Sequence, residues 1–296
     1  MTAQEVDAPA AVRIAVLLTH AHPDSGDVSA AAATALEAAE RAGYRLVADG
    51  EEVAKHPVLS GKVDEVAELP VQPDLCLVLG GDGTILRGMR TFGPAGVPVF
   101  GINYGTIGFL AALERDQLDR GLELAFAGEF DVMELPALEL GEAGSGALGL
   151  NDVSFARHPH RRVAELAYRV NGEEIGHVRC DGLVAATPAG STGYNLANQG
   201  PILAWGVKGF AVSFIAPHTL SARPLVVAPA DVVGVRNAGP RDPVDVALDG
   251  RHAAELGPGD EIEIRFREGV GRLAQLPGSS FYRRIREKFG AIAAQG

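Results

Sequence analysis

The stretch that decides the fold of the first half of the chain is "LVLGGDGTILR", residues 77–87. An apolar run ends in a glycine turn and is followed by amphipathic sequence, which predicts a buried strand, a tight turn and a helix. Glycine permits positive φ and lets a ligand approach the backbone. A helix N-terminus at the carboxyl end of a parallel strand is where α/β sheets bind anions. One carboxylate, Asp82, interrupts this predicted anion site.

Strands and helices are predicted to alternate on both sides of the turn. The run "VRIAVLLTH" (12–20) is almost continuously apolar, as expected of a strand buried on both faces of a parallel sheet. Similar patterns predict strands over 44–48, 74–80 and 97–103, and helices over 28–43 and 114–128. This alternation predicts a Rossmann-like, doubly wound α/β domain.

After about Gly128 the sequence changes to short β-type runs separated by Gly, Pro, Asn and Asp. The segments "NGEE" (171–174) and "LDGR" (248–251) are turn candidates between such runs. A mostly β, sandwich-like second domain is therefore expected.

The C-terminal segment "SSFYRRIREKFGAIAAQ" (279–295) predicts an amphipathic helix with Ser280 as its cap. We expect this helix to return to the first domain. The predicted organisation is an α/β domain over 1–127 together with 278–296, and a β domain over 128–277.

Composition limits the classes of function. The 296 residues are 47% hydrophobic, enough for two domains. Two distant cysteines, Cys76 and Cys180, exclude a disulfide framework, and no Cys or His spacing suggests a protein-held metal. The N-terminus lacks a signal peptide pattern and apolar runs are too short to span a bilayer, so we expect a cytoplasmic protein without a membrane partner. A net charge of −12 argues against a nucleic-acid partner but not against small anions.

Asp82 has two physical interpretations. As a helix N-cap, its carboxylate would accept bonds from amides of the first turn. As a functional group, it would accept a proton from an attacking hydroxyl or position a metal near transferring phosphate. Nearby phosphate would then raise the basicity of the carboxylate, which suits a general base.

Further motifs distinguish between kinase families. They are "NYGTIGFL" (103–110), "NDV" (151–153), "DGLVAATPAGSTGYNLANQGPIL" (181–203), "PHTLSARPLVVAP" (217–229) and "LDGR" (248–251). In this combination and order the chain resembles the NAD kinase family over nearly its whole length. The GGDGT turn alone would equally suit lipid kinases of the diacylglycerol type, whereas the 181–203 stretch is much more specific.

The resemblance implies an enzyme that transfers a terminal phosphoryl group from ATP or polyphosphate to the 2′-hydroxyl of the adenosine ribose of NAD(H). It also implies a donor-bound Mg²⁺ or Mn²⁺ and a homodimer or homotetramer. Two alternatives remain open at this point. One is a lipid kinase with the same turn, and the other is a non-catalytic NAD-binding sensor.

The resemblance also implies roles for individual residues. Asp82 matches the catalytic aspartate, Asn151 and Asp152 match a pair that holds ribose hydroxyls, and Asp181 matches a residue near the nicotinamide. The implied nucleotide-binding residues are Gly81, Gly83, Thr84, Arg87, Asn151, Asp152, Arg162, Arg179, Asp181, Thr192, Gly193, Tyr194, Asn195, Leu196 and Ala197.

Each of these residue types also has a purely structural explanation. Arg87 could be a solvated arginine on a helix face, and Arg162 could belong to a solvated basic loop. Asn151 and Asp152 could form a β-turn, and Tyr194 could be packed beneath a capped turn. The chain departs from the common family pattern at Ala189, Gly193, Ala197 and Arg251.

Overall fold

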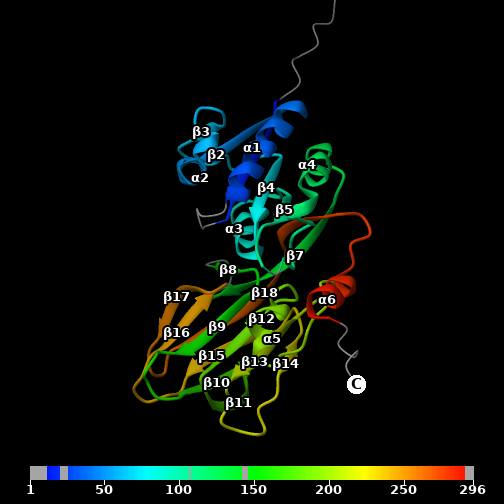
Figure 1. Cartoon of the computed structure of the whole chain (residues 1–296). Helices are drawn as coiled ribbons and strands as arrows, with labels where there is room; N and C mark the ends of the chain where they lie inside the picture. The colour runs from blue at the N-terminus through cyan, green and yellow to red at the C-terminus, as the bar shows by residue number, and fades with distance from the viewer. Residues whose placement is uncertain (1–11, 21–25, 107, 142–145, 291–296) are drawn as a thin grey trace, which may run out of the picture. The chain divides into compact units, whose positions relative to one another are not determined.

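The computed structural model describes residues 12–20, 26–106, 108–141 and 146–290 (Figure 1). The chain divides into two compact units. Unit 1 contains Met1–Met133 and Arg272–Ser279, and unit 2 contains Glu134–Gly271 and Ser280–Gly296. The α/β sequence followed by β sequence predicted this division, because each pattern builds its own hydrophobic core.

Unit 1 is built on a parallel sheet with the strand order β3-β2-β1-β4-β5, and β6 pairs with β5. Its strands are β1 (Arg13–Thr19), β2 (Tyr44–Asp49), β3 (Asp64–Val66), β4 (Leu75–Gly80), β5 (Val99–Asn103) and β6 (Leu113–Glu114). The order reverses between β1 and β4. Open parallel sheets bind ligands at such a switch point, beyond the carboxyl ends of the strands.

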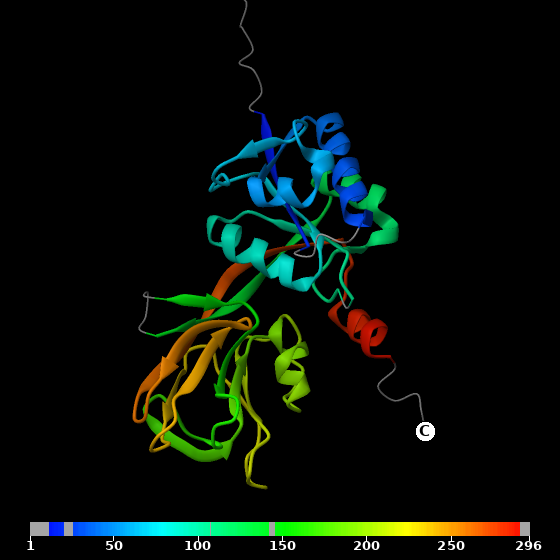
Figure 2. The same cartoon turned by 60° about the vertical axis from the view of Figure 1, so that its left-hand side comes forward.

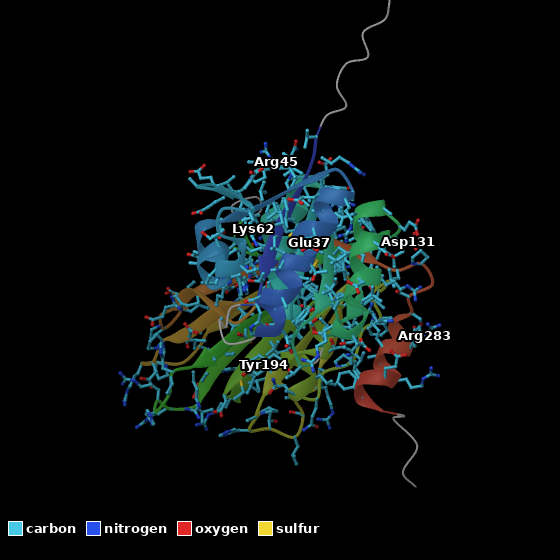
Figure 3. The ribbon with its side chains drawn as sticks, turned by 45° about the horizontal axis from the view of Figure 1, so that its top comes forward. Glu37, Arg45, Lys62, Asp131, Tyr194 and Arg283 are labelled. Atoms are coloured by element: carbon cyan, nitrogen blue, oxygen red, sulfur yellow. The ribbon has the colours of Figure 1, made fainter. Side chains whose placement is uncertain are left out.

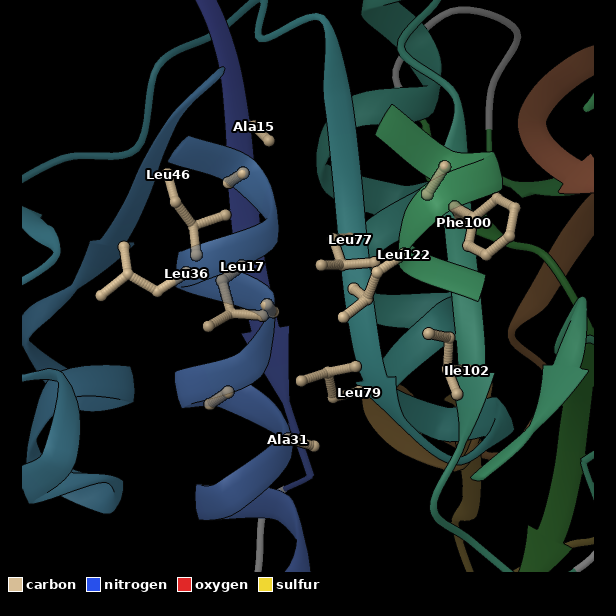
Figure 4. Packing of buried hydrophobic residues seen from close by; sticks show 14 of the residues in the cluster. Ala15, Leu17, Ala31, Leu36, Leu46, Leu77, Leu79, Phe100, Ile102 and Leu122 are labelled. Carbon is tan, nitrogen blue, oxygen red and sulfur yellow. The ribbon is translucent and has the colours of Figure 1, made fainter. Parts of the chain in front are cut away.

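Helices cover both faces of this sheet. They are α1 (Gly26–Arg41), α2 (Gly50–Lys55), α3 (Asp82–Phe92) and α4 (Leu118–Ala127), with short 3-10 turns η1 (Pro57–Leu59), η2 (Gly93–Ala95) and η3 (Arg115–Gln117). The helices α1 and α4 share one core with the alternate residues Leu17, Leu77 and Ile102 of the strands (Figure 4). On the other face α3 packs so closely that a Cβ at Gly88 would lie 3.2 Å from Cys76 Sγ (Figure 2). This alternation confirms the doubly wound α/β prediction.

Unit 2 is a sandwich of antiparallel sheets. One layer has the order β14-β13-β12-β9-β16-β17, and the other contains β11-β10-β15-β18 with β7 and β8. The strands are β7 (Asp131–Leu140), β8 (Ala147–Gly149), β9 (Asp152–Arg157), β10 (Ala164–Val170), β11 (Glu173–Cys180), β12 (Gly182–Ala186), β13 (Phe210–Ile215), β14 (Leu225–Val227), β15 (Val232–Asn237), β16 (Val244–Leu248), β17 (Arg251–Leu256) and β18 (Glu261–Gln275). Residues of both layers, including Phe155, Phe210, Leu166 and Val235, form one buried cluster. The predicted β-sandwich-like domain is present.

The C-terminal helix α6 (Phe281–Phe289) begins at Ser280, whose side chain accepts from Arg283 N at 3.4 Å, as predicted for a cap. Its packing differs from the prediction. Phe281 packs against Trp205 with ring centroids 5.5 Å apart and the rings tilted, and Arg284 lies over the Trp205 ring, so the helix belongs to unit 2. An amphipathic pattern predicts a buried face but does not identify the partner of that face.

The segment that returns to unit 1 is the end of β18 instead. Leu273 pairs with Val99, and Gln275 Nε2 donates to Leu110 O at 2.8 Å. The first boundary between the two units lies after Met133, whereas the sequence pattern predicts it after residue 127. Among the described residues, no helix combines the length and apolar character needed to cross a membrane.

Candidate active site

The glycine turn of unit 1 lies between β4, which ends at Gly80, and α3, which begins at Asp82. None of Gly80, Gly81 and Gly83 has a positive φ, so the expected left-handed conformation is absent from this turn. The glycines allow close packing instead. A Cβ at Gly80 would lie 2.8 Å from Thr84 Oγ1, and one at Gly105 would lie 2.8 Å from the Cα of Gly81.

The outer side of the turn is open. A Cβ at Gly83 would meet no atom within 4 Å, and Gly83 is exposed. The start of α3 at Gly83 therefore borders open space at the carboxyl end of a parallel strand. This is the arrangement that binds phosphate groups.

Asp82 does not cap the helix. The N-cap residue is Gly81, and Asp82 is the first residue of α3. Its carboxylate accepts from two backbone amides of the loop after β5, Phe109 N at 2.8 Å and Leu110 N at 2.9 Å. These bonds fix the orientation of the carboxylate. A carboxylate can accept about four hydrogen bonds, so the two amides do not exhaust its capacity.

Arg87, one turn further along α3, is not a solvated helix-face residue. Its guanidinium donates to Glu52 Oε1 at 2.5 Å and to Thr19 O at 3.3 Å. Glu52 is completely buried, whereas the Arg87 side chain keeps 36% of its area exposed. Glu52 thus holds Arg87 next to the end of β1 while part of the guanidinium still meets solvent.

Glu52 belongs to a polar cluster that the sequence interpretation missed. Its Oε2 accepts from Thr19 N at 3.1 Å and also from Thr19 Oγ1. His56 Nε2 and Thr19 Oγ1 are 2.8 Å apart, and Ser29 Oγ lies 2.8 Å from the other ring nitrogen. Burial lowers the pKa of His56, with Glu52 opposing and Lys55 adding to the shift.

In unit 2, the predicted pair Asn151–Asp152 lies where the chain enters β9. Asp152 is buried, and its pKa is raised to about 7, first by burial and then by the charge of Asp249. Asn151 Oδ1 is buried without a hydrogen-bond partner among the described residues. A buried acceptor of this kind costs free energy unless a donor reaches it.

The segment after β12 packs directly on this pair. Thr187 N donates to Asn151 O at 2.9 Å, and Thr187 Oγ1 donates to Leu150 O at 2.6 Å. At Gly190 a Cβ would lie 2.0 Å from Asn151 O, so no other residue fits without a backbone shift. The motifs around 151 and 187–197, far apart in sequence, therefore form one structure.

The predicted binding residues of this segment differ in accessibility. Asn195 is fully buried, and its amide donates to Ser191 O at 3.1 Å and to Pro201 O at 3.0 Å, which closes the loop. Thr192 and Leu196 are half-buried, and Gly193, Tyr194 and Ala197 are exposed. The helix α5 (Tyr194–Ala197) is a single turn.

Tyr194 lies within electrostatic range of two carboxylates. The side chain, labelled in Figure 3, is 43% exposed, and its pKa is raised by burial and then by the charges of Asp152 and Asp181. Asp181 accepts from Arg157 Nε at 2.6 Å, and this bond lowers the pKa of Asp181. Asp152 and Asp181 therefore both act electrostatically on Tyr194. Arg157 is an additional residue that sequence interpretation missed.

The two remaining predicted arginines, Arg162 and Arg179, line one small cavity of about 160 Å³, together with Arg157 and Arg241. Arg179 Nε lies 3.5 Å from Glu165 Oε1, which holds it on the surface of β11. Arg157 joins this cavity to Asp181 through its ion pair. Among the arginines of this cavity, Arg157 thus contacts one of the predicted binding residues, Asp181.

Metal-ligating side chains do not cluster in the part of the chain that the structure describes. No group of three or more His, Cys, Asp or Glu could hold a metal ion there. The turn over 80–84 offers one carboxylate, Asp82. Such a site suits a divalent ion that takes most of its ligands from phosphate oxygens and water.

The α/β unit has a glycine turn with an oriented carboxylate, and the β-sandwich unit has a polar loop with buried acceptors. These features suit a nucleotide-dependent phosphotransferase. Family models agree with this class. Residues 14–130 match the ATP-NAD kinase N-terminal domain, and residues 150–272 match the ATP-NAD kinase C-terminal domain. The chain belongs to the NAD kinase family.

Curated relatives support this assignment. The chain is 35% identical over 255 residues to NAD kinase of Symbiobacterium thermophilum, covering 82% of this chain and 90% of the relative. It is 36% identical over 232 residues to NAD kinase of Carboxydothermus hydrogenoformans, covering 77% and 83%. The lipid kinase and the non-catalytic sensor, the two alternatives from the sequence, are not favoured by these findings.

Solved structures share the fold. Yeast NADH kinase complexed with NADH has a TM-score of 0.79 at 21% identity, covering 96% of this chain and 89% of that one. NAD kinase from Archaeoglobus fulgidus in complex with ATP has a TM-score of 0.69 at 24% identity, covering 94% and 97%.

Proposed function

We propose that this chain transfers the terminal phosphoryl group of ATP or polyphosphate to the 2′-hydroxyl of the adenosine ribose of NAD or NADH. The observation that carries the proposal is the orientation of the Asp82 carboxylate by Phe109 N and Leu110 N at the start of α3. A carboxylate held by two amides beside an anion-binding turn suits a general base that works next to phosphate.

In the proposed reaction Asp82 accepts the proton as the ribose oxygen attacks the terminal phosphorus of the donor. The new O–P bond forms while the bond between that phosphorus and the leaving phosphate oxygen breaks, so ADP or a shortened polyphosphate departs. Amides of the turn around Gly83 orient the donor, and Arg87, held by Glu52, adds positive charge beside it. Position and electrostatics thus supply most of the catalysis.

The residues of unit 2 are proposed to bind the dinucleotide. Asn151 and Asp152 would accept ribose hydroxyls, and Tyr194 would present its ring to a base. Asp181 and Arg179 would lie at the nicotinamide end. Support comes from the unpartnered Asn151 Oδ1 and from the electrostatic coupling of Tyr194 with Asp152 and Asp181.

A divalent ion, Mg²⁺ or Mn²⁺, is proposed to enter with the donor. When bound, it would neutralise charge on the donor phosphates during transfer. Asp82 is the residue of the turn that could contact it. The single carboxylate in residues 80–84 supports an ion held mainly by the donor.

One assay tests the proposed function. Purified protein, Mg²⁺, NAD or NADH, and ATP or polyphosphate are combined in all pairs, and NADP(H) is measured. Formation of NADP(H) with at least one pair is the expected result, and the rates identify the preferred donor and acceptor. Tight NAD binding without any NADP(H) would instead support the sensor function.

We further propose self-association through unit 2 and a cytoplasmic location. Leu220, which is 93% exposed, is the apolar residue of unit 2 that we propose such an interface covers. The two cysteines are buried free thiols, as in proteins of a reducing compartment. Light scattering after size exclusion should give a dimer or tetramer, and Leu220→Ser should weaken it.

A further inference from the structure

Asp249 makes an unusual set of contacts for a turn residue. It lies between β16 and β17 in the left-handed region, with φ of 47°. Its carboxylate accepts from the backbone amides of Leu150 at 3.1 Å, Asn151 at 2.7 Å and Asp152 at 3.2 Å. Three successive amides directed at one carboxylate bend the backbone around it, as in a backbone anion nest.

The contact is reciprocal. Asp249 N donates to Asp152 O at 3.0 Å. A Cβ at Gly149 would lie 2.9 Å from Asp152 O and 3.4 Å from Asp249 Oδ1, so the chain reaches this bend through a position that suits only glycine. The segment over 150–152 is therefore fixed from the side of the β16–β17 turn.

The opposite side of the segment is also fixed. Thr187 binds the carbonyls of Leu150 and Asn151 through its hydroxyl and its amide. The Asn151–Asp152 backbone is thus held between two hydrogen-bonded supports. Thr187 and Asp249 both lie in motifs that carry the family resemblance, but the resemblance gives neither residue a role of its own.

We propose that Asp249 is the positioning residue for dinucleotide binding, because it sets the backbone that presents Asn151 and Asp152 to the ribose hydroxyls. This inference rests on the proposed binding role of that pair. Asp249 itself need not touch the substrate. The loss of its carboxylate would leave three amides without their acceptor and release the bend.

The charge of Asp249 should also affect how NAD affinity depends on pH, because it raises the pKa of Asp152. Asp152 is 7% exposed, and its pKa of about 7 results from burial and from Asp249. Tyr194 on α5 also faces Asp152, and Asp181 acts on the same tyrosine. Because an ionised Asp152 is the better acceptor for hydroxyls, NAD affinity should increase as the pH rises through about 7.

The test uses the full chain with Asp249→Gly and Asp249→Asn, and Asp245→Asn as the matched control. Glycine retains the left-handed backbone and removes the carboxylate, whereas asparagine retains one acceptor oxygen and removes the charge. Asp245 lies on the same hairpin and binds His252 at 2.5 Å on the surface, away from residues 150–152. NAD affinity is measured by calorimetry from pH 5.5 to 8.5, beside kcat, KM and thermal unfolding.

We expect Asp249→Gly to weaken NAD binding about tenfold or more while kcat at saturation changes little. Asp249→Asn should bind NAD more tightly than Asp249→Gly. Its NAD affinity should also increase at a lower pH than that of the unmodified chain, because the charge that raises the pKa of Asp152 is absent. Asp245→Asn should match the unmodified chain in affinity and midpoint.

Two results would overturn the inference. One is unchanged NAD affinity in a folded Asp249→Gly protein, and the other is an unchanged pH midpoint in Asp249→Asn. The midpoint measurement still decides the question if the glycine variant fails to fold. If the proposed function is wrong, the result is different: the unmodified chain binds NAD but forms no NADP(H).

Discussion

The glycine turn of unit 1 and the Asn151–Asp152 segment of unit 2 both contain hydrogen bonds between backbone amides and a carboxylate. The two regions differ in which of these groups is oriented for the proposed function. In unit 1 the backbone amides of Phe109 and Leu110 orient the carboxylate of Asp82, which is itself the proposed reacting group. In unit 2 the carboxylate of Asp249 orients the backbone, and neighbouring side chains are proposed to contact substrate. In unit 1 the backbone therefore orients a carboxylate, whereas in unit 2 a carboxylate orients the backbone.

The largest effect is expected from Asp82→Asn. The amide retains the size of the side chain but cannot accept the proton, so kcat should fall by about 10²–10⁴-fold. NAD affinity should change much less, because the proposed binding residues belong to unit 2. Steady-state kinetics and calorimetry measure the two quantities.

Asp74→Asn is the matched control for that variant. Asp74 precedes β4, whereas Asp82 follows it, and its carboxylate also accepts from a backbone amide, Ile14 N at 2.6 Å. If both variants lose the same activity, the effect of Asp82→Asn is structural and the general-base assignment fails.

Glu52→Gln tests how much the buried charge of Glu52 contributes to the free energy of unfolding. The variant leaves Arg87 and Lys55 without their anionic partner. Because Arg87 still meets solvent, we expect a loss of about 2–3 kcal/mol in the free energy of unfolding rather than the full penalty of a buried pair. Urea unfolding measures it. Glu51→Gln, an exposed neighbour on α2, should have almost no effect.

Tyr194→Ala should weaken NAD binding about tenfold, because an aromatic surface beside the two carboxylates is removed. Tyr194→Phe distinguishes the contribution of the ring from that of the hydroxyl and should retain most of the affinity. Tyr282→Ala, which removes an exposed tyrosine of α6, serves as the control. Equal affinities for all of these proteins would remove Tyr194 from the proposed site.

The smallest effect is a gain of stability in Asp152→Asn at high pH. The pKa of Asp152 is about 7 in the folded chain against an ordinary value of 3.8, so the folded state binds this proton more tightly. The resulting stability is fully present below about pH 3.8 and is lost as the pH rises through about 7.

An asparagine at position 152 does not ionise and so has no such loss of stability. The variant should therefore unfold at a higher temperature than the unmodified chain at pH 8, by a few degrees, with a smaller difference at pH 5. A constant difference across this range would contradict the raised pKa.

Local sequence patterns predicted the parts of the structure that depend on neighbouring residues. The strand, turn and helix over 77–87 follow from an apolar run, glycines and amphipathic spacing, and all three are present. The "LDGR" turn is also present, with Asp249 in the left-handed region. These features require contacts only within a few residues of the sequence.

Partners distant in sequence were not predictable in this way. Asp82 binds amides 27 and 28 positions away, and Asp249 binds amides 97 to 99 positions away. Glu52 and His56 lie in "GEEVAKHP", which is polar enough to suggest a surface helix, yet both are buried by the end of β1. The packing of α6 on Trp205 has the same cause, because an apolar helix face does not specify which surface it covers.

The end of β18 joins the α/β sheet of unit 1, although it is synthesised much later than the other strands of that sheet. Leu273 pairs with Val99, and Gln275 bonds to Leu110, so unit 1 includes residues synthesised after nearly all of unit 2. During translation the first 133 residues leave the ribosome without this strand. The pairing of Leu273 with Val99 therefore forms only after nearly all of unit 2 has been synthesised, and the first 133 residues alone lack it.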